Sequence, residues 1–380
     1  MDEINEVLTR GVEKILPAKE SLARLMSERK ISLYQGFDPS SPHLHLGQLA
    51  GIRKLAKFQS LGHKVIFLIG DFTGMIGDPS DKLAARKQLT REEVEKNSKD
   101  WKELASRVMD FEGANKAEFK HNSEWLDKIS FKDLIGITSN FTVQQMIERD
   151  MFQNRLKANA PIYLHEFLYP VAQGIDSVEM DVDLEIGGTD QLFNMLAGRT
   201  LVKALKGKEK YVLTLKLLED SSGKKMGKTE GNAVNLTDSP EDIFGKIMAL
   251  ADGFIERGIE LLTDMPVNLA DSEGPLKAKK KLAYDVLAQL YGESMARQSQ
   301  EKFESTFQER KPEFDTEISP KQTLADTIAQ LPSVGSNSQA KRLIAQGAVD
   351  VSGETVTDPN YRPRKGEEVK VGKKEFVKIK

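Results

Sequence analysis

The sequence predicts a doubly wound α/β domain built on a parallel sheet, followed by an all-α domain and a small α+β module. Three observations lead to this fold class. Strand-like and helix-like segments alternate through residues 31–218, residues 239–309 have helical periodicity throughout, and the last 60 residues contain a helix pair followed by short strand-like segments.

The first strand, helix and strand indicate that the sheet is parallel. Ile31–Gln35 is a short β-prone run, and His43–Leu61 carries apolar residues at helical spacing and stops before Gly62. Val65–Ile69 is apolar at every position, which is typical of a strand buried on both faces. Strand, helix and strand in this order form a βαβ unit and therefore predict a parallel sheet of the Rossmann type.

The remaining segments continue this alternation and set the expected domain boundaries. Further helices are expected at residues 90–111, 134–156, 161–178 and 190–205, and further strands at 118–120, 182–186 and 211–218. We expect the α/β domain at 1–220, a mobile loop at 221–235, a helical domain at 236–310, a linker at 311–322 and a final module at 323–380.

Composition excludes several classes of protein. With 39% hydrophobic and 30% charged residues, the chain can form a core and is not of the disordered type. It has no cysteine, which removes disulfides and Cys-ligated zinc and fits a reducing compartment. The acidic start Met1–Glu6 is unlike a signal peptide, and the most apolar run, Val65–Gly70, is far shorter than the ~20 residues of a membrane helix. We therefore expect a cytoplasmic protein without a membrane span.

The charge is distributed unevenly along the chain. The formal net charge is −3, yet residues 321–380 hold 11 basic and 7 acidic residues. A basic end on an acidic body indicates an anionic partner such as RNA, but a lysine-rich solvated surface gives the same count. Charge alone leaves both interpretations open.

The first candidate site follows the first predicted strand, where ligands of doubly wound sheets bind. It runs from Gly36 to Gln48 and leads into a helix, whose N-terminal N–H groups attract phosphate. His45 and Gln48 add side-chain donors one turn apart, and Gly47 lets a ligand approach the backbone. Taken alone, His45 would be an ordinary surface or capping residue.

The second candidate site is the loop Lys224–Thr229, which follows a strand ending near Leu218. Lysines in a glycine-containing loop are commonly no more than solvated. A mobile loop carrying Lys225 and Lys228 can also close over a triphosphate and neutralise the charge that builds on departing pyrophosphate.

These two segments together resemble the signatures of class I aminoacyl-tRNA synthetases. His45-Leu46-Gly47-Gln48 resembles His-Ile-Gly-His, and residues 225–229 resemble Lys-Met-Ser-Lys-Ser, in the expected order. Gln48 replaces a histidine but still donates from its amide, and Thr229 keeps a hydroxyl where the signature has serine. Gly227 has no hydroxyl, so only its backbone N–H can contribute. The resemblance implies catalytic roles for His45, Gln48, Lys225, Lys228 and Thr229, and for Lys82 and Arg86 on a second mobile loop.

The third candidate site, Gly187–Gln191, directly follows a predicted strand. Paired glycines allow close backbone approach and the Asp190 carboxylate can bind ribose hydroxyls, although a glycine turn capped by Asp190 explains the same residues. The segment resembles the Gly-Gly-Ser-Asp-Gln run of tyrosyl-tRNA synthetases. The resemblance implies that ATP is bound by Gly36, Asp38, Gly47, Gly188, Asp190, Met226 and Lys228.

The fourth candidate site is the predicted helix at 161–178. Tyr169, Gln173 and Asp176 share one face, and an apolar row of Leu164, Leu168, Val171, Ile175 and Val178 covers the other. A polar stripe is ordinarily a solvated face. Only two of these 18 residues are charged, however, where the overall composition would give about five. We therefore expect the helix to be buried on both sides and its polar stripe to line a site.

Together with Tyr34 at the end of the first strand, this stripe resembles the tyrosine pocket of tyrosyl-tRNA synthetases. The resemblance implies that Tyr34 and Asp176 hold the phenolic hydroxyl of the substrate. A phenol can donate to a carboxylate and accept from a hydroxyl, and phenylalanine would leave that buried pair unsatisfied. We therefore expect no editing domain. The implied contacts of the substrate's ammonium end are Tyr169, Gln173 and Asp78, with Gln191 beside them; taken alone, Asp78 would be a turn former.

The C-terminal segment 338–349 resembles the alpha-L-type RNA-binding module that ends bacterial tyrosyl-tRNA synthetases. Binding through such a module should weaken as salt rises. The implied phosphate contacts are Lys341, Arg342, Arg362, Arg364 and Lys365.

The resemblance covers nearly the whole chain and implies a two-step reaction. Tyrosine and ATP, as its Mg²⁺ complex, give tyrosyl-adenylate and pyrophosphate, and the tyrosyl group then passes to the 3′-terminal adenosine of tRNA(Tyr). A carboxylate is an adequate nucleophile, so we expect positioning and electrostatics, not a general base, to drive activation. The implied partners are tyrosine, ATP, tRNA(Tyr) and a second copy of the chain, with an anticodon-recognising role for 236–310 and with no resident metal or tightly bound cofactor.

Three alternative functions remain. A tryptophanyl-tRNA synthetase has both signatures, but an indole N–H only donates and would not need both Tyr34 and Asp176. A catalytically inactive RNA-binding relative would not need Lys225 and Lys228. A nucleotidyltransferase of similar fold would account for neither the tyrosine pocket nor the C-terminal module.

Overall fold

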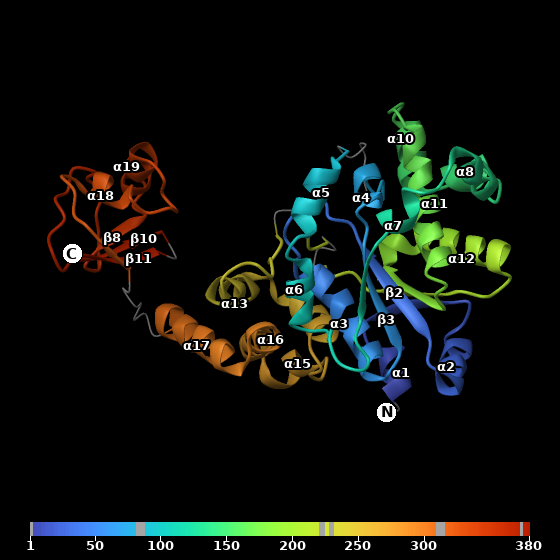
Figure 1. Cartoon of the computed structure of the whole chain (residues 1–380). Coiled ribbons are helices and arrows are strands. Elements are labelled where there is room, and N and C mark those ends of the chain that lie inside the picture. Colours follow the sequence, from blue (N-terminus) through green and yellow to red (C-terminus); the bar gives the residue numbers. More distant parts are fainter. Residues whose placement is uncertain (1–2, 81–87, 220–224, 228–231, 309–315, 373–374) are drawn as a thin grey trace. The chain divides into compact units, whose positions relative to one another are not determined.

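The computed structural model describes residues 3–80, 88–219, 225–227, 232–308, 316–372 and 375–380. The chain divides into two compact units, Met1–Arg297 and Gln298–Lys380, whose elements are labelled in Figure 1. Each unit is described by itself.

A six-stranded sheet in the order β1-β6-β5-β2-β3-β4 forms the centre of the first unit. All neighbouring pairs are parallel except β1 with β6, which are antiparallel. The chain builds outward from β2 through β3 to β4, and then places β5 and β6 on the other side of β2. The order therefore reverses between β2 and β5, and a crevice at the carboxyl ends of these strands is the expected ligand site. The strands are β1 Val12–Leu16, β2 Ser32–Phe37, β3 Lys64–Ile69, β4 Glu118–His121, β5 Leu184–Gly188 and β6 Tyr211–Leu215.

The two faces of the sheet are covered by different helices. On β2, the side chain of Tyr34 reaches Ser177 on α11, whereas the side chain of Gln35 lies against Gly51 on α3. Because successive side chains of a strand point to opposite faces, α11 and α3 lie on opposite sides of the sheet, as Figure 1 shows. Helix α12 packs against α11 on the same side. The elements concerned are α3 Leu46–Ser60, α11 Leu164–Glu179 and α12 Leu192–Lys206.

Two long predicted helices are wrong, because each is broken into shorter ones. The predicted helix 90–111 begins as expected, with a reciprocal cap between Thr90 and Glu93, but is divided between α5 and α6 near Asp100. The predicted helix 134–156 is three helices, because Ser130 and Thr142 each cap a new start. The remaining helices of this region are α1 Glu3–Val7, α2 Lys19–Glu28, α4 Thr73–Ile76, α5 Arg91–Ser98, α6 Trp101–Ser106, α7 Ser123–Leu126, α8 Phe131–Thr138, α9 Val143–Ile147 and α10 Asp150–Lys157.

The helical stretch that follows the sheet is confirmed. Helix α13 begins where Ser239 caps the Asp242 N–H and Pro240 occupies the first turn. These elements are α13 Pro240–Ala249, the 3₁₀ turn Asp252–Phe254, α14 Ile255–Leu262, α15 Leu269–Glu273, α16 Pro275–Tyr291 and α17 Glu293–Phe303, which crosses the boundary between the units.

The second unit is a small α+β module with a five-stranded sheet in the order β7-β11-β10-β8-β9. The predicted helix pair is present and packs on a core of Leu, Ile, Val and Ala side chains. Its elements are a π-helical turn Glu304–Gln308, β7 Thr316–Ile318, α18 Leu324–Ile328, α19 Asn337–Ala345, β8 Val349–Val351, β9 Glu354–Thr355, β10 Glu368–Val371 and β11 Glu375–Ile379. Across the described ranges of both units, no helix has the length and apolar character needed to cross a lipid bilayer.

Candidate active site

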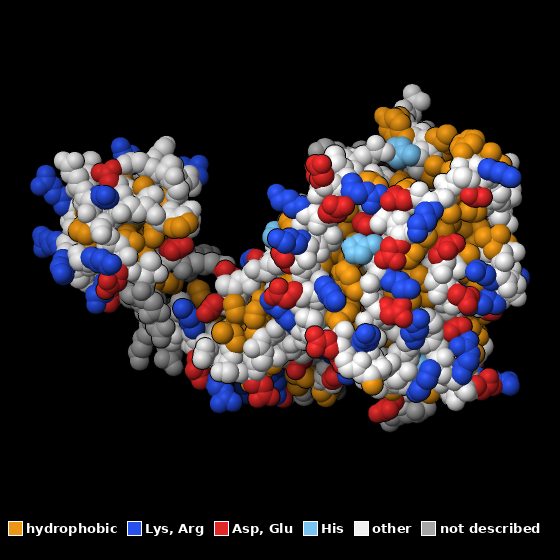
Figure 2. All heavy atoms as spheres, in the orientation of Figure 1, with side chains coloured by type: hydrophobic (Ala, Val, Ile, Leu, Met, Phe, Trp, Pro, Cys, Tyr) orange, Lys and Arg blue, Asp and Glu red, His pale blue; other side chains and the backbone are white. Residues whose placement is uncertain are grey.

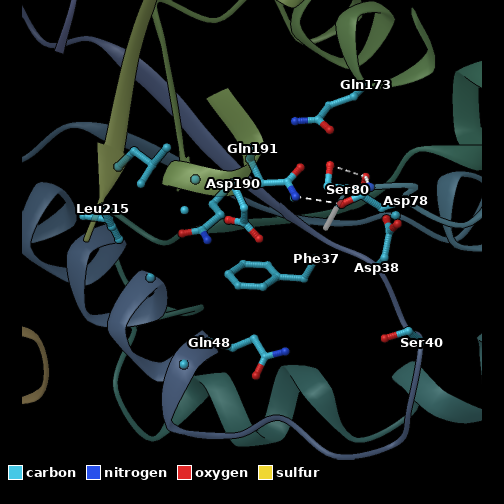
Figure 3. Close-up of a pocket in the computed structure, with 18 of the residues that line it drawn as sticks. Phe37, Asp38, Ser40, Gln48, Asp78, Ser80, Gln173, Asp190, Gln191 and Leu215 are labelled. Atoms are coloured by element: carbon cyan, nitrogen blue, oxygen red, sulfur yellow. Dashed lines mark hydrogen bonds between the residues drawn. The ribbon is translucent and has the colours of Figure 1, made fainter. Parts of the chain in front are cut away.

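A pocket of about 1090 Å³ opens at the carboxyl ends of β2 and β5, where the strand order reverses. It is lined by the ends of these strands, the start of α3, the loop that follows β3, the polar stripe of α11 and residues 215–219 and 225–227. Figure 3 shows these side chains converging on one space from separate elements. All four predicted site segments therefore contribute to a single pocket.

Tyr34 and Asp176 lie at the buried end of this pocket, with exposed fractions of 0% and 2%. Burial is the main cause of the raised pKa of both groups, and the neighbouring carboxyl groups of Glu185 and Asp176 further raise the pKa of Tyr34. Both side chains line the same pocket, as a site for one small polar group of a ligand requires. In this structure the Tyr34 hydroxyl is hydrogen bonded to Ser177 Oγ at 2.9 Å.

Asp176 is held by two residues that the sequence did not single out. Trp125 Nε1 donates to Asp176 Oδ1 over 2.8 Å, and Asn122 Nδ2 donates to Oδ2 over 3.2 Å. Both donors come from α7 and the residue before it, directly after β4. They fix the orientation of the carboxyl group at the base of the pocket.

The middle of the pocket carries an array of acceptors suited to a cation. Asp38 Oδ2 accepts from Tyr169 Oη over 2.7 Å, and Asp38 Oδ1 accepts from Thr73 Oγ1 over 2.7 Å. Asp78 Oδ1 accepts from the hydroxyl and the N–H of Ser80, and Asp78 Oδ2 accepts from Gln191 Nε2 over 2.7 Å (Figure 3). Carboxylates fixed in this way can receive an ammonium group without reorganising.

The start of α3 forms the anion-binding end of the pocket. His45 is the N-cap: its Nδ1 accepts from the Gly47 N–H over 3.1 Å, while Gln48 Oε1 accepts from the His45 N–H over 2.9 Å. With its oxygen used in this cap, Gln48 presents its NH₂ group to the pocket. Burial, assisted by the charge of Lys225, lowers the pKa of His45 to about 4, so its imidazole is neutral. Because Nδ1 accepts from Gly47, the ring proton lies on Nε2.

Both class I signature segments line this end of the pocket, and a Cβ at Gly47 would lie 3.9 Å from the Met226 carbonyl oxygen. The chain just after the second signature also pairs with the start of α3. His45 forms an isolated bridge with Asn235, and the Leu46 N–H donates to the Val234 carbonyl over 3.1 Å. Lys225 forms an ion pair with Asp190. The residues proposed for ribose and for phosphate therefore satisfy one another here, and a nucleotide that binds both must separate them.

Close packing explains Gly188 in the third segment. A Cβ at Gly188 would lie 2.4 Å from Asp190 Oδ1, so a side chain there would displace the carboxylate. Gly36, Gly47 and Met226 also line the pocket. The predicted catalytic residues Lys82, Arg86, Lys228 and Thr229 lie outside the described residues.

The candidate RNA contacts of the second unit are all exposed. Lys341 and Arg342 project from α19, and Arg362, Arg364 and Lys365 lie on the segment between β9 and β10. Figure 2 shows several basic side chains on the visible face of this unit. They are accessible to an anionic partner.

The fold and the pocket define a class I aminoacyl-tRNA synthetase. Residues 26–308 match the family described as tRNA synthetases class I (W and Y), and residues 322–369 match the S4 domain family. The chain belongs to the class I (W and Y) family of tRNA synthetases and carries an S4 domain.

Relatives that match over nearly their full length indicate which synthetase of this class the chain resembles. The chain is 38% identical to the tyrosine–tRNA ligase of Thermotoga maritima, over 100% of this chain and 97% of that protein. It is 40% identical to the tyrosine–tRNA ligase of Oleidesulfovibrio alaskensis, over 100% of this chain and 99% of that protein. Both matches therefore run over nearly the full length of both proteins.

Solved structures agree on the fold. A C-terminally truncated mitochondrial tyrosyl-tRNA synthetase of Coccidioides posadasii aligns with a TM-score of 0.66 at 24% identity, covering 79% of this chain and 91% of that one. The tyrosyl-tRNA synthetase of Archaeoglobus fulgidus, solved with L-tyrosine, aligns with a TM-score of 0.60 at 21% identity, covering 79% of this chain and 100% of that one.

Proposed function

We propose that the chain is a tyrosine–tRNA ligase that activates L-tyrosine with ATP and transfers the tyrosyl group to the 3′-terminal adenosine of tRNA(Tyr). The observation that carries this proposal is the placement of buried Tyr34 and Asp176 at the base of a pocket whose mouth is the start of α3. This geometry supports a substrate that has a phenolic hydroxyl at one end and reacts with a nucleotide at the other.

Tyrosine is held at both ends in this proposal. Tyr34 and Asp176 address the phenolic hydroxyl. Tyr169, Gln173 and Asp78 address the ammonium group, with Gln191 holding Asp78 in place. The carboxylate then points towards the start of α3, where the α-phosphate of ATP would lie.

The nucleotide is bound by backbone and carboxylate groups around the β2 and β5 ends. Gly36, Gly47 and Gly188 allow the nucleotide to approach the backbone, Asp190 takes the ribose hydroxyls, and Asp38 and Met226 line the same space. Mg²⁺ enters bound to the phosphates of ATP and neutralises part of their charge.

The tyrosine carboxylate attacks the α-phosphorus in line and pyrophosphate leaves. The developing phosphate charge is stabilised by fixed donors, so no proton needs to be removed from the nucleophile. In the second step a ribose hydroxyl of the terminal adenosine attacks the activated carbonyl and AMP leaves. The donors proposed for the first step are His45, Gln48, Lys82, Arg86, Lys225, Lys228 and Thr229.

Amino-acid-dependent ATP–pyrophosphate exchange tests this function directly. Among the twenty amino acids, tyrosine alone should support exchange, and Asp176→Ala should reduce it to near background. Exchange with tryptophan, or no exchange with any amino acid, would favour one of the two main alternatives. Asp181→Ala is a matched control, because Asp181 is exposed and pairs with Lys208 on the surface.

The proposal also assigns a function to each segment of the chain. We assign catalysis to residues 1–220 and the signature loop to 221–235. We assign anticodon recognition to 236–310, and RNA binding to 323–380 beyond a linker at 311–322. A chain ending at residue 310 should retain tyrosine-dependent exchange while losing most of its affinity for tRNA(Tyr). Binding by the full chain should weaken steeply with salt, which filter binding at several salt concentrations measures. We place this activity in the cytoplasm, where translation uses charged tRNA.

We also propose that the chain works as a homodimer. Six of the ten large hydrophobic side chains that are exposed in the described ranges lie on residues 131–164, including Phe131 and Leu164 at 78% and Val143 at 73%. Leu164 was expected to belong to the buried row of α11, so its exposure is a correction. Figure 2 shows hydrophobic side chains gathered over α8 and α10. Exposed apolar surface of this kind marks an interface.

Light scattering on purified protein tests the oligomeric state. The intact chain should have twice the 42.5 kDa mass of one copy, and Phe131→Asp with Val143→Asp should give a folded monomer. Leu276→Asp is the control, because Leu276 is 56% exposed but lies on α16, outside this surface. A monomeric wild type would refute the dimer while leaving the catalytic proposal intact.

A further inference from the structure

A buried ion pair lies at the wall of the tyrosine pocket, which its carboxylate partner, Glu185, helps to line. Glu185, the second residue of β5, and Lys210, just before β6, have exposed fractions of 1% and 0% and are paired through Lys210 Nζ and Glu185 Oε2. Lys210 Nζ also donates to the Met195 carbonyl over 3.1 Å. A buried ion pair is seldom more stabilising than an apolar pair of the same size. The role of this ion pair therefore depends on the groups that it contacts.

The carboxylate of Glu185 contacts two elements of the pocket. Oε1 accepts from Gln173 Nε2 over 2.9 Å, and Oε2 accepts from Ser177 Oγ over 3.3 Å. Ser177 Oγ is in turn 2.9 Å from the hydroxyl of Tyr34. The ion pair is thus connected by hydrogen bonds to a residue proposed for the ammonium group and to one proposed for the phenol.

An ionised carboxylate can only accept hydrogen bonds, so Gln173 and Ser177 are the donors in their bonds to Glu185. Gln173 must direct its NH₂ group to Glu185, so its amide oxygen is left for the pocket. Ser177 has one hydroxyl proton and gives it to Glu185, so it can only accept from Tyr34. Two other acceptors of the Tyr34 proton, the backbone carbonyl of Gln173 at 3.5 Å and the carboxylate of Glu185, are also part of the protein.

We propose that Lys210 is a positioning residue for tyrosine selection: by holding Glu185 as a carboxylate, it makes both Tyr34 and Gln173 present an oxygen lone pair to the substrate. The phenolic O–H of tyrosine then donates to Tyr34, and the ammonium group donates to Gln173. This inference rests on the proposed function and assigns the hydrogen-bond directions at Tyr34 in the opposite sense to that expected from the sequence.

Asp176, the other residue proposed to contact the phenol, is consistent with donation of the phenolic proton to Tyr34. Once the phenol has donated to Tyr34, its oxygen faces Asp176. Burial raises the pKa of Asp176 well above its usual range, which favours the protonated carboxyl that can donate to this oxygen. Phenylalanine would leave both of these buried groups without a partner.

Steric limits keep the ion pair in one position. A Cβ at Gly198 on α12 would lie 2.5 Å from Lys210 Nζ and 2.9 Å from Ser177 Oγ. Because α12 approaches this closely, neither group has room to change partner while the fold is intact.

The test compares two variants with wild type in tyrosine-dependent ATP–pyrophosphate exchange. Lys210→Met keeps the length of the side chain and removes the charge. It should raise KM for tyrosine by ~10- to 100-fold and leave KM for ATP unchanged. Lys208→Met is the matched control, because Lys208 lies two residues away and pairs with Asp181 on the surface. It should leave both constants unchanged.

The pH dependence separates positioning from simple structural damage. Without Lys210, the Glu185 carboxyl is buried beside Tyr34 and Asp176 with no cation to pair with, and an unpaired buried carboxylate takes up a proton. KM for tyrosine in Lys210→Met should then fall towards the wild-type value as the pH is raised and Glu185 ionises. Wild type should show no such recovery. A KM that is raised equally at every pH would overturn the proposal.

The double variant Lys210→Met with Glu185→Gln keeps the proposal testable if the single variant fails to fold. It has no buried charge, so its thermal stability should return towards that of wild type. An amide at position 185 must donate on one side, so discrimination between tyrosine and phenylalanine should remain ~10-fold or more below wild type. Full recovery of both stability and discrimination would show that the pair serves charge balance alone. Absence of tyrosine-dependent exchange in the wild type would instead overturn the proposed function.

Discussion

Trp125→Phe removes one hydrogen bond from the carboxyl group that we assign to the phenol of the substrate. Trp125 Nε1 lies 2.8 Å from Asp176 Oδ1, and Asn122 covers the other oxygen, so the variant leaves one buried acceptor without its donor. An unsatisfied buried acceptor costs ~1–3 kcal/mol, and a central value of about 2 kcal/mol corresponds to a ~30-fold loss in kcat/KM for tyrosine. The phenol lies far from the reacting carboxylate, so the loss should appear in KM for tyrosine, with kcat and KM for ATP nearly unchanged.

The second tryptophan provides the control. The chain has only two, and Trp101 Nε1 donates to the Pro42 carbonyl over 3.1 Å, in the loop before α3. Trp101→Phe makes the same indole-to-phenyl change away from Asp176, so KM for tyrosine should not change. Titration of tyrosine in the pyrophosphate exchange assay measures both variants. Equal effects of the two variants, or an unchanged KM for tyrosine in Trp125→Phe, would refute the idea that this hydrogen bond orients Asp176.

Three further predictions concern stability and nucleotide binding. Burial lowers the pKa of His63 from 6.5 to about 4, so the unfolded chain takes up this proton first and stability is lost as the pH falls from about 6.5 to 4. Urea unfolding should show a loss of about 2 kcal/mol between pH 7 and pH 5 from this group, and His63→Gln should remove it. Glu166→Gln leaves the buried Arg155 without its partner and should cost ~3–5 kcal/mol in the same measurement. Asp190→Asn should raise KM for ATP ~10- to 100-fold without changing KM for tyrosine in the exchange assay.

The sequence predicts a strand where the residues of that strand are themselves apolar enough to show that it is buried. Lys64–Ile69 is apolar after its first residue because β3 has strands on both sides and helices on both faces, so the pattern identifies it without knowledge of its neighbours. Val12–Leu16 was missed. It contains Glu13 and Lys14, and it lies at the edge of the sheet beside β6, which is about 200 residues away in the chain. An edge strand of mixed polarity is specified by its pairing, which a local pattern does not contain.

Helix boundaries were wrong where capping residues outweighed apolar spacing. Between residues 134 and 156 the spacing of apolar residues continues through Phe141, but Thr142 and Gln145 form a reciprocal cap that starts α9. The same kind of cap, between Thr90 and Glu93, begins α5 at the expected start of the helix at 90–111. The signal for the break was therefore present in the sequence, and apolar periodicity was given too much weight.

The polar stripe of α11 could be predicted because its residues share one helix face, but the groups that hold it could not. Asn122 and Trp125 follow β4, a strand whose side chains are all half-buried and whose sequence pattern is correspondingly weak. Ligands bind at the carboxyl ends of strands, so a strand recognised at Glu118–His121 would also have predicted site residues in the segment that follows it.

The ion pair of Glu185 could be predicted only in part from the sequence. A carboxylate in the centre of a sheet must have a partner, because an unpaired buried charge is too costly, so the residue predicts a buried cation somewhere in the fold. Lys208 and Lys210 are two residues apart, so in an extended segment both would point to the same face. The sequence alone does not show which of them pairs with Glu185. In the structure Lys208 pairs with Asp181 at the surface, whereas Lys210 enters the space that Gly198 leaves open and reaches Glu185. The choice between them depends on how closely α12 approaches the sheet, and this tertiary fact sets the hydrogen-bond directions that we infer for tyrosine selection.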